Sequence, residues 1–166
     1  ANGERVYRKA KKRYIVNPYA TIFSNDNYYL VCYSDKYKNV THYRIDRMES
    51  VEVESDNITP TSCISSFNIS EHRKQVFGMF VGKEERVSIV IENSLIDAVM
   101  DKFGEDVQLE DRGNGTAVLN ISVQISPMFI AWCCSFGDKL NVISPQKVIT
   151  EIKNYITQLK DIYGIN

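Results

Sequence analysis

The residues best suited to chemistry lie close together in the segment 40–48, VTHYRIDRM. His42 and Arg44 fall on the same face of a β-strand, because strand side chains alternate between two faces. An arginine fork pairs with phosphate through two parallel hydrogen bonds, so this strand could hold an anionic ligand. The alternative is a solvated surface on which Asp46 neutralises Arg44 or Arg47 and leaves no site.

Tyrosines concentrate in the same part of the chain, since eight of the ten lie between residues 7 and 43. Alternation divides the strand expected at residues 28–34, YYLVCYS, into two faces. We expect one face to form a core with the next strand through Tyr28, Leu30, Tyr43 and Ile45. The opposite face then carries the candidate ligand residues Tyr29, Tyr33, His42 and Arg44. Aromatic rings on such a face can stack bases.

Charge is distributed unevenly along the 166 residues, although the net charge is only −1. Residues 1–47 hold ten lysines and arginines against four acidic residues, a net charge of +6. Residues 84–166 hold seven against twelve, a net charge of −5. Local fields rather than total charge steer a ligand, so the asymmetry favours an anionic partner for the N-terminal part. The alternative is a cationic hairpin that keeps an edge strand soluble.

No catalytic or metal-binding pattern is present in the sequence. There is no GxSxG elbow, no HExxH helix and no glycine loop that would cradle a phosphate. With only His42 and His72, a metal site would need thiolates or carboxylates at spacings that the chain lacks. The sequence therefore predicts a protein that is not an enzyme and that binds no metal or cofactor.

The cysteines and the apolar runs bear on the compartment. Cys32, Cys63, Cys133 and Cys134 match no zinc or redox spacing, and we expect them to be reduced and mostly buried. Free thiols are typical of a reducing compartment, which predicts a cytoplasmic protein. The longest apolar run, MFIAWCC at residues 128–134, is far too short to span a membrane.

The element pattern predicts two domains of the α+β class. Residues 1–80 contain short strands joined by polar turns and one short helix capped by Ser70, which indicates a small antiparallel β-barrel. Pro18 is expected to break or bend one strand. Alternation in ESVEVES, residues 49–55, places Val51 and Val53 inward. Residues 81–85, VGKEE, form the expected linker.

Residues 86–166 have a different pattern. Strands and helices follow in the order β-α-β-β-α-β-α, with Pro127 opening one helix and Pro145 the last. Leu95, Val99 and Phe103 lie on one apolar stripe of the helix expected at residues 94–104. This order is typical of a ferredoxin-like α/β domain, built on a split βαβ unit, with an extra C-terminal helix.

Residues 17–53, NPYATIFSNDNYYLVCYSDKYKNVTHYRIDRMESVEV, resemble the WYL domain of bacterial transcriptional regulators. That family has a proline-led strand, an aromatic-Tyr-Leu triplet, a polar turn and a strand that ends in an R-x-D-R-like pattern. The triplet here is YYL at residues 28–30, with tyrosine in place of tryptophan, and the pattern is intact in Arg44, Asp46 and Arg47. Residues 129–148, FIAWCCSFGDKLNVISPQKV, are similar to the C-terminal extension that often follows a WYL domain.

The resemblance implies an Sm-like β-barrel that senses a ligand and binds nucleic acid or nucleotide-like effectors on a basic, aromatic face. It also implies a homodimer, and it makes Arg44 and Arg47 the expected ligand contacts. Strict alternation places these arginines on opposite faces, so a bulge or a strand end near Asp46 must reconcile them. Regulators of this family carry an N-terminal helix-turn-helix domain, which this sequence lacks. We therefore expect the chain to be the effector half of a longer regulator.

Two hypotheses follow for the function. The first is a sensor that binds single-stranded nucleic acid or a nucleotide-like effector through Arg44, Arg47, His42, Tyr29 and Tyr33. The second is a dimerisation or protein-interaction module without a small ligand, in which the arginines pair with acids such as Glu84 and Glu85. A dimer that is indifferent to anions would favour the second.

Overall fold

The computed structural model describes residues 13–34, 39–58 and 67–165. By its internal contacts the chain divides into two compact units, Ala1–Ser66 and Phe67–Asn166, which we call the first unit and the second unit.

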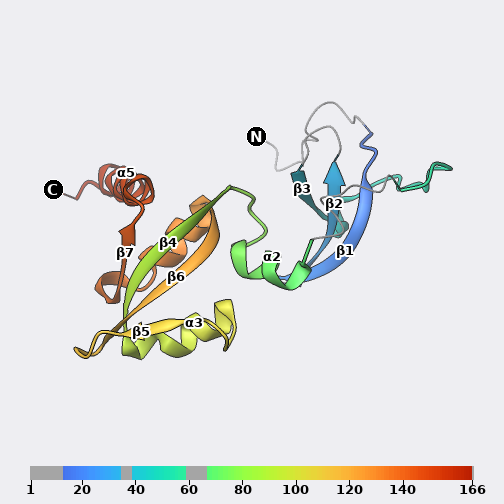
Figure 1. The fold of residues 1–166 in the computed structure, drawn as a ribbon. Coiled ribbons are helices and arrows are strands. Elements are labelled where there is room, and N and C mark those ends of the chain that lie inside the picture. The colour runs from blue at the N-terminus through green and yellow to red at the C-terminus, as the bar shows by residue number, and fades with distance from the viewer. Residues whose placement is uncertain (1–12, 35–38, 59–66, 166) are drawn as a thin grey trace. The chain divides into compact units, whose positions relative to one another are not determined.

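The first unit contains an antiparallel sheet of three strands in the order β1-β2-β3 (Figure 1). The strands are β1 (Asn17–Ser24), β2 (Asn27–Ser34) and β3 (Asn39–Arg44), and a 3-10 turn, η1 (Ile45–Arg47), follows β3. Asn25 and Asp26 join β1 to β2 with positive φ values of 47° and 58°. Two consecutive residues with positive φ form the tight hairpin turn that matches the twist of the strands.

Proline interrupts the ladder between β1 and β2, as expected. Pro18 lies opposite Cys32 and Ala20 lies opposite Val31, so Tyr19 is an extra residue at which the register shifts. Proline donates no hydrogen bond to a ladder, and an irregularity beside it bends the strand.

The face of the first sheet that turns inward differs from the prediction. Ile22, Val31 and Tyr33 are buried on one face, whereas the other face is buried at Cys32 but exposed at Tyr28. The predicted core was wrong at Tyr28 and Ile45, which are exposed, while Leu30 and Tyr43 are partly buried. Alternation separates the faces of a strand without deciding which one is covered. Branched Ile22 of β1 and Val31 of β2 lie on the same face of the sheet, and both are buried there.

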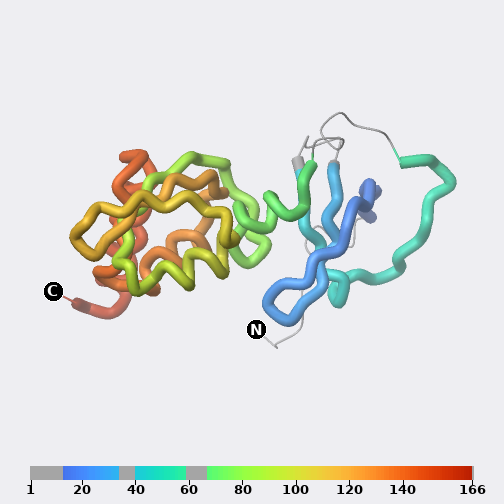
Figure 2. Tube along the Cα trace, turned by 60° about the horizontal axis from the view of Figure 1, so that its bottom comes forward, coloured from blue at the N-terminus to red at the C-terminus, as the bar shows by residue number. Residues whose placement is uncertain are grey.

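The strand expected around residues 49–55 is not formed. Val51 is exposed, and Val53 has an exposed fraction of 98%, so neither side chain points inward. Figure 2 shows residues 48–58 as an extended loop that leaves the three strands. Glu52 in this loop accepts two hydrogen bonds from Arg13, at 2.8 and 3.1 Å, on the surface. Alternation without a neighbouring strand buries nothing, which explains the wrong prediction.

Among the described residues the first sheet is open, with β1 and β3 at its edges. The mixed class with antiparallel sheets is thus confirmed, and the Sm-like barrel stays a prediction.

The second unit begins with a helix and then follows the predicted order of strands and helices. Its elements are α2 (Ile69–Gln75), β4 (Lys83–Glu92), α3 (Ile96–Phe103), β5 (Leu109–Asp111), β6 (Thr116–Ile125), α4 (Pro127–Cys134), β7 (Leu140–Ser144) and α5 (Gln146–Tyr163). Short 3-10 turns precede α3 and β7. The four strands form an antiparallel sheet in the order β5-β6-β4-β7 (Figure 1).

Helix caps place the helix boundaries. Asn68, rather than the predicted Ser70, caps α2, because its side-chain oxygen accepts hydrogen bonds from the backbone N–H groups of Ser70 and Glu71. Ser126 caps α4 in the same way, and Pro127 occupies the first helical turn as predicted. Helix α2 belongs to the second unit by its contacts. The linker predicted at residues 81–85 stays a prediction.

One face of the second sheet is covered by helices and forms a continuous core. Alternate residues of β4 and β6 are almost fully buried, and α3, α4 and α5 contribute Val99, Phe103, Phe129 and Val148 to the same cluster. Phe77 and Trp132 join the two phenylalanines in a group of aromatic rings with centroids 5.3 to 6.2 Å apart. The predicted stripe is therefore confirmed at Val99 and Phe103 of α3, while Leu95 packs against the core from the 3-10 turn before the helix.

Cysteines and hydropathy agree with part of the prediction. Cys32, Cys133 and Cys134 are free thiols, the first two buried, while Cys63 lies outside the described residues. Among the described helices none is long and apolar enough to cross a bilayer.

Candidate ligand-binding face

The register between β2 and β3 brings four of the five predicted site residues onto one face. Tyr29 lies opposite Arg44, and Val31 lies opposite His42. Tyr33, opposite Val40, follows on the same side of β2. Directly opposed residues of an antiparallel pair point to the same face, so the predicted grouping of tyrosines, histidine and arginine holds as geometry.

Arg44 ends β3 and is held by a carboxylate two residues later. Its Nε and one terminal nitrogen donate to the two oxygens of Asp46, at 3.0 and 2.8 Å. This bond, together with the nearby Tyr29 hydroxyl, raises the pKa of Arg44 further above its ordinary value. The Arg44 side chain retains an exposed fraction of 25%. The salt bridge that the sequence left open as an alternative is therefore present.

That salt bridge leaves donors on the guanidinium. Arginine carries five N–H donors; Asp46 accepts two of them, and Tyr29 also hydrogen-bonds the group. The remaining donors lie on the same planar group, which can serve a carboxylate and a phosphate together. Asp46 thus fixes the orientation of the Arg44 fork without exhausting its binding capacity.

Burial separates the predicted site residues. Tyr33 has an exposed fraction of only 6%, so its ring belongs to the interior of the first unit and offers no face to a base. Tyr29 and His42 are partly buried. The accessible part of the face is consequently formed by Tyr29, His42 and Arg44.

Arg47 lies in η1, the turn after β3, and not on the strands that carry this group. The predicted strand end near Asp46 is present, because β3 stops at Arg44 and η1 contains Ile45, Asp46 and Arg47. Strand alternation therefore does not force Arg47 onto the face opposite Arg44. Arg47 is exposed, and among the described residues no ion pair holds it. The structure thus places Arg47 next in the chain to the Arg44–Asp46 pair as a second cation at this end of the sheet.

Neither metal chemistry nor thiol chemistry is prepared among the described residues. Among the described residues no three histidine, cysteine or acidic side chains converge on a point that could hold a metal ion. Burial raises the pKa of Cys32 to about 11 and that of Cys133 to about 12. A thiol with a raised pKa is protonated at neutral pH and is a poor nucleophile.

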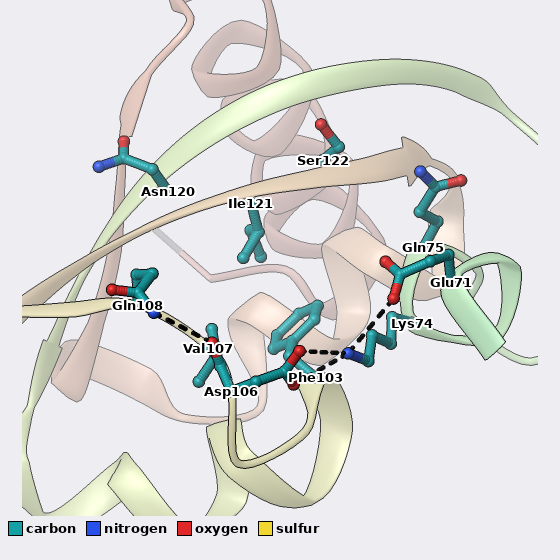
Figure 3. A pocket seen from close by; sticks show the side chains of 10 residues that line it. All are labelled: Glu71, Lys74, Gln75, Phe103, Asp106, Val107, Gln108, Asn120, Ile121 and Ser122. Carbon is teal, nitrogen blue, oxygen red and sulfur yellow. Dashed lines mark hydrogen bonds and ion pairs between the residues drawn. The ribbon is translucent and has the colours of Figure 1, made fainter.

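The second unit contains a polar hollow that the sequence analysis missed. Figure 3 shows its lining, in which Lys74 of α2 forms an ion pair with Asp106 at 3.0 Å and lies 3.5 Å from Glu71. The hollow has a volume of about 220 Å³ over a floor that includes Phe103. Glycine at position 104 avoids a steric clash with this ion pair, since a Cβ there would lie 2.7 Å from an Asp106 oxygen. Gly104 was the sequence feature that could have indicated the hollow, but a glycine at this position is also the usual way for a helix to end.

Charge distinguishes the hollow from the first-unit face. Glu71, Lys74 and Asp106 sum to −1, and the ion pair lowers the pKa of Asp106. An anionic ligand is therefore disfavoured in the hollow and favoured beside Arg44 and Arg47.

The two family models that match the chain fall in different units. A family model for the WYL domain matches residues 5–53, and one for the WCX domain matches residues 83–159. Among solved structures the chain is similar to proteasome accessory factor B/C (PafBC) of Arthrobacter aurescens, with 15% sequence identity and a TM-score of 0.36. That match covers 82% of this chain and 21% of the PafBC chain, so the chain spans about a fifth of the length of PafBC. No curated protein sequence matches the chain.

Proposed function

Since this chain belongs to the WYL-domain regulators, we propose that it is the effector-sensing region of a transcriptional regulator and that its effector is anionic. The effector is a single-stranded nucleic acid or a nucleotide-like molecule, bound at the end of the first sheet. The observation that carries this proposal is the Arg44 fork, oriented by Asp46 and placed opposite Tyr29 in a basic part of the chain.

The resemblance to the same family also suggests a fold type for each unit. The first unit is an Sm-like barrel of which the described residues supply three strands, and the second unit is a ferredoxin-like domain with α5 as its extra helix. The sheet order β5-β6-β4-β7, with every pair antiparallel, supports the second assignment, because a split βαβ unit inserts one strand between two parallel ones.

Binding acts as a signal only if it favours one arrangement of the regulator over another. A phosphate at Arg44 shares the guanidinium with Asp46 and adds negative charge beside that carboxylate. The resulting repulsion alters η1, where Asp46 and Arg47 are adjacent. In this proposal the regulator is a cytoplasmic homodimer, and a helix-turn-helix domain outside this chain contacts DNA.

The test is fluorescence polarisation of a short labelled single-stranded DNA, titrated with the chain at two salt concentrations. We expect saturable binding that weakens with salt, because phosphate capture releases counterions. The variant Arg44→Ala should bind about tenfold or more weakly, since hydrogen bonds to charged groups are worth roughly 1.5 to 3 kcal/mol.

Arg112→Ala supplies the matched control. Arg112 is exposed in the turn between β5 and β6, so this variant removes the same charge from the second unit. It should bind DNA as the unaltered chain does. Equal affinity of Arg44→Ala and Arg112→Ala would contradict the proposal.

A second candidate function is a dimerisation module, and the Arg44–Asp46 salt bridge favours it to a degree because it gives Arg44 a structural partner. The acids expected to pair with the arginines are engaged within the second unit. Glu84 accepts a hydrogen bond from Gln75, and Glu85 forms ion pairs with Lys83 and Lys147. A dimer that forms equally well with Arg44→Ala and ignores added DNA would support this candidate.

A further inference from the structure

The hairpin end of the first sheet carries an apolar surface on the face opposite Tyr29. Phe23 and Tyr28 are cross-strand partners there, with exposed fractions of 54% and 60%. Ile45, the first residue of η1, is also exposed. We call Phe23, Tyr28 and Ile45 the sheet-end band. Grouped exposed apolar side chains of this size are typical of binding surfaces.

The geometry of the band suits a flat ligand. The ring centroids of Phe23 and Tyr28 lie 4.9 Å apart, and the ring planes are tilted by 54°. The tight turn at Asn25 and Asp26 fixes the two residues opposite each other. More than half of each residue is exposed, so each ring offers surface on which another planar group can stack.

Cations flank the band. Arg47 follows Ile45 by two residues in η1, and Arg44 precedes it at the end of β3. Asp46 lies between the two arginines in the chain and pairs with Arg44, so Arg44, Asp46 and Arg47 together carry one positive charge. Aromatic rings beside cations are the combination that binds single strands, because the rings stack bases while the cations follow the phosphates.

We propose that the sheet-end band stacks unpaired bases of a single-stranded nucleic acid whose phosphates contact Arg44 and Arg47. This inference rests on the proposed function and adds a base-binding subsite to it. The strand crosses the end of the sheet, with phosphates on the Arg44 side and bases on Phe23 and Tyr28. Stacking on a ring requires no particular base, so the subsite selects for single strands rather than for a sequence.

Two probes separate stacking from phosphate capture in the full chain. One is a labelled oligothymidylate, and the other is an oligonucleotide of equal length with abasic sugars and the same phosphates. We expect the chain to bind the thymidylate about fivefold or more tightly, since stacking on one aromatic residue contributes roughly that much. Tyr28→Leu should abolish the difference between the probes and leave abasic binding unchanged, while Tyr28→Phe should preserve the difference.

The outcomes distinguish the two levels of the account. Equal binding of both probes by the unaltered chain overturns the stacking subsite and leaves phosphate capture intact. Binding of neither probe overturns the proposed function itself. A difference between the probes that survives in Tyr28→Leu and in Phe23→Leu also overturns the subsite. Sedimentation provides a further check, because a dimer that is lost in Tyr28→Leu would identify the band as a protein interface and overturn base stacking.

Discussion

Strand β2 of the first sheet and strand β4 of the second both alternate apolar side chains between two faces, but they differ in how far these side chains are buried. In β4 every second residue from Val87 to Ile91 is fully buried beneath helices. In β2 the buried residues stop at Val31, and the hairpin end exposes Tyr28. The second unit thus uses its apolar residues for stability, whereas the first unit leaves aromatic rings and cations in contact with solvent, where a ligand can reach them.

The two units also hold cations differently. Arg44 in the first unit meets Asp46 at the surface. Lys102 in the second unit is partly buried. It donates to the backbone carbonyls of Arg73 and Val76 at 3.1 and 2.7 Å, and its Nζ lies 4.2 Å from the centre of the Phe77 ring. The first arrangement is open to exchange with a ligand, and the second fastens α2 to α3.

The largest expected effect lies in the second core. Phe129→Ala removes a fully buried ring and should lower the free energy of unfolding of the second unit by about 3 to 5 kcal/mol. Urea unfolding followed by the fluorescence of Trp132, the single tryptophan, reports on this unit. A loss below about 1 kcal/mol would show that this core is not what stabilises the second unit.

A smaller effect should appear in the pH dependence of stability. Burial lowers the pKa of Lys102 from 10.5 to about 8, so between these values the unfolded chain binds more protons than the folded chain. The folded state therefore gains stability as pH rises through this window, with a slope of at most about 1.4 kcal/mol per pH unit for one proton.

Lys102→Met removes this proton and retains an apolar stem. Thiols with raised pKa values, such as Cys133, act in the opposite direction but are present in both proteins. The stability of the unaltered chain relative to Lys102→Met should consequently increase from pH 8 to pH 10. A flat difference would mean that burial does not lower the pKa of Lys102, because the two carbonyls and the Phe77 ring hold the ammonium as well as water does.

The smallest effect is expected in the loop after η1. Val53→Thr changes a side chain that is almost fully exposed, so the stability of the chain should change by less than about 0.5 kcal/mol. Thermal unfolding monitored by circular dichroism is sufficient to detect more. A substantial loss would indicate that this segment is covered in solution, as the sequence pattern alone predicted.

The sequence predicted the second unit well because its signals are long and independent. Helical stripes such as Val99 and Phe103 fix a helix, and Pro127 fixes where the next one begins. The first unit was predicted less well, because short alternating strands specify two faces and not which of them is covered. Tyr28 and Tyr33 were therefore assigned to the wrong environments.

The candidate site could be predicted as a grouping but not in its details. Alternation alone places Tyr29 beside Arg44, and the register confirms it. Arg44 and Asp46 are two positions apart, and this spacing alone does not determine whether their side chains meet. The pairing depends on the geometry of the turn η1, which the sequence did not predict. Gly104, which makes room for the Lys74–Asp106 pair, carried too little information by itself to reveal the hollow.

The most direct test of the central claim is an NMR titration of the isotopically labelled chain with short single-stranded DNA. The account predicts that the largest amide shifts cluster at the end of the first sheet, around Tyr29, Arg44 and Arg47, while the strands of the second unit change little. Shifts concentrated around Lys74 and Asp106, with the first sheet unaffected, would contradict it and would move the ligand to the second unit.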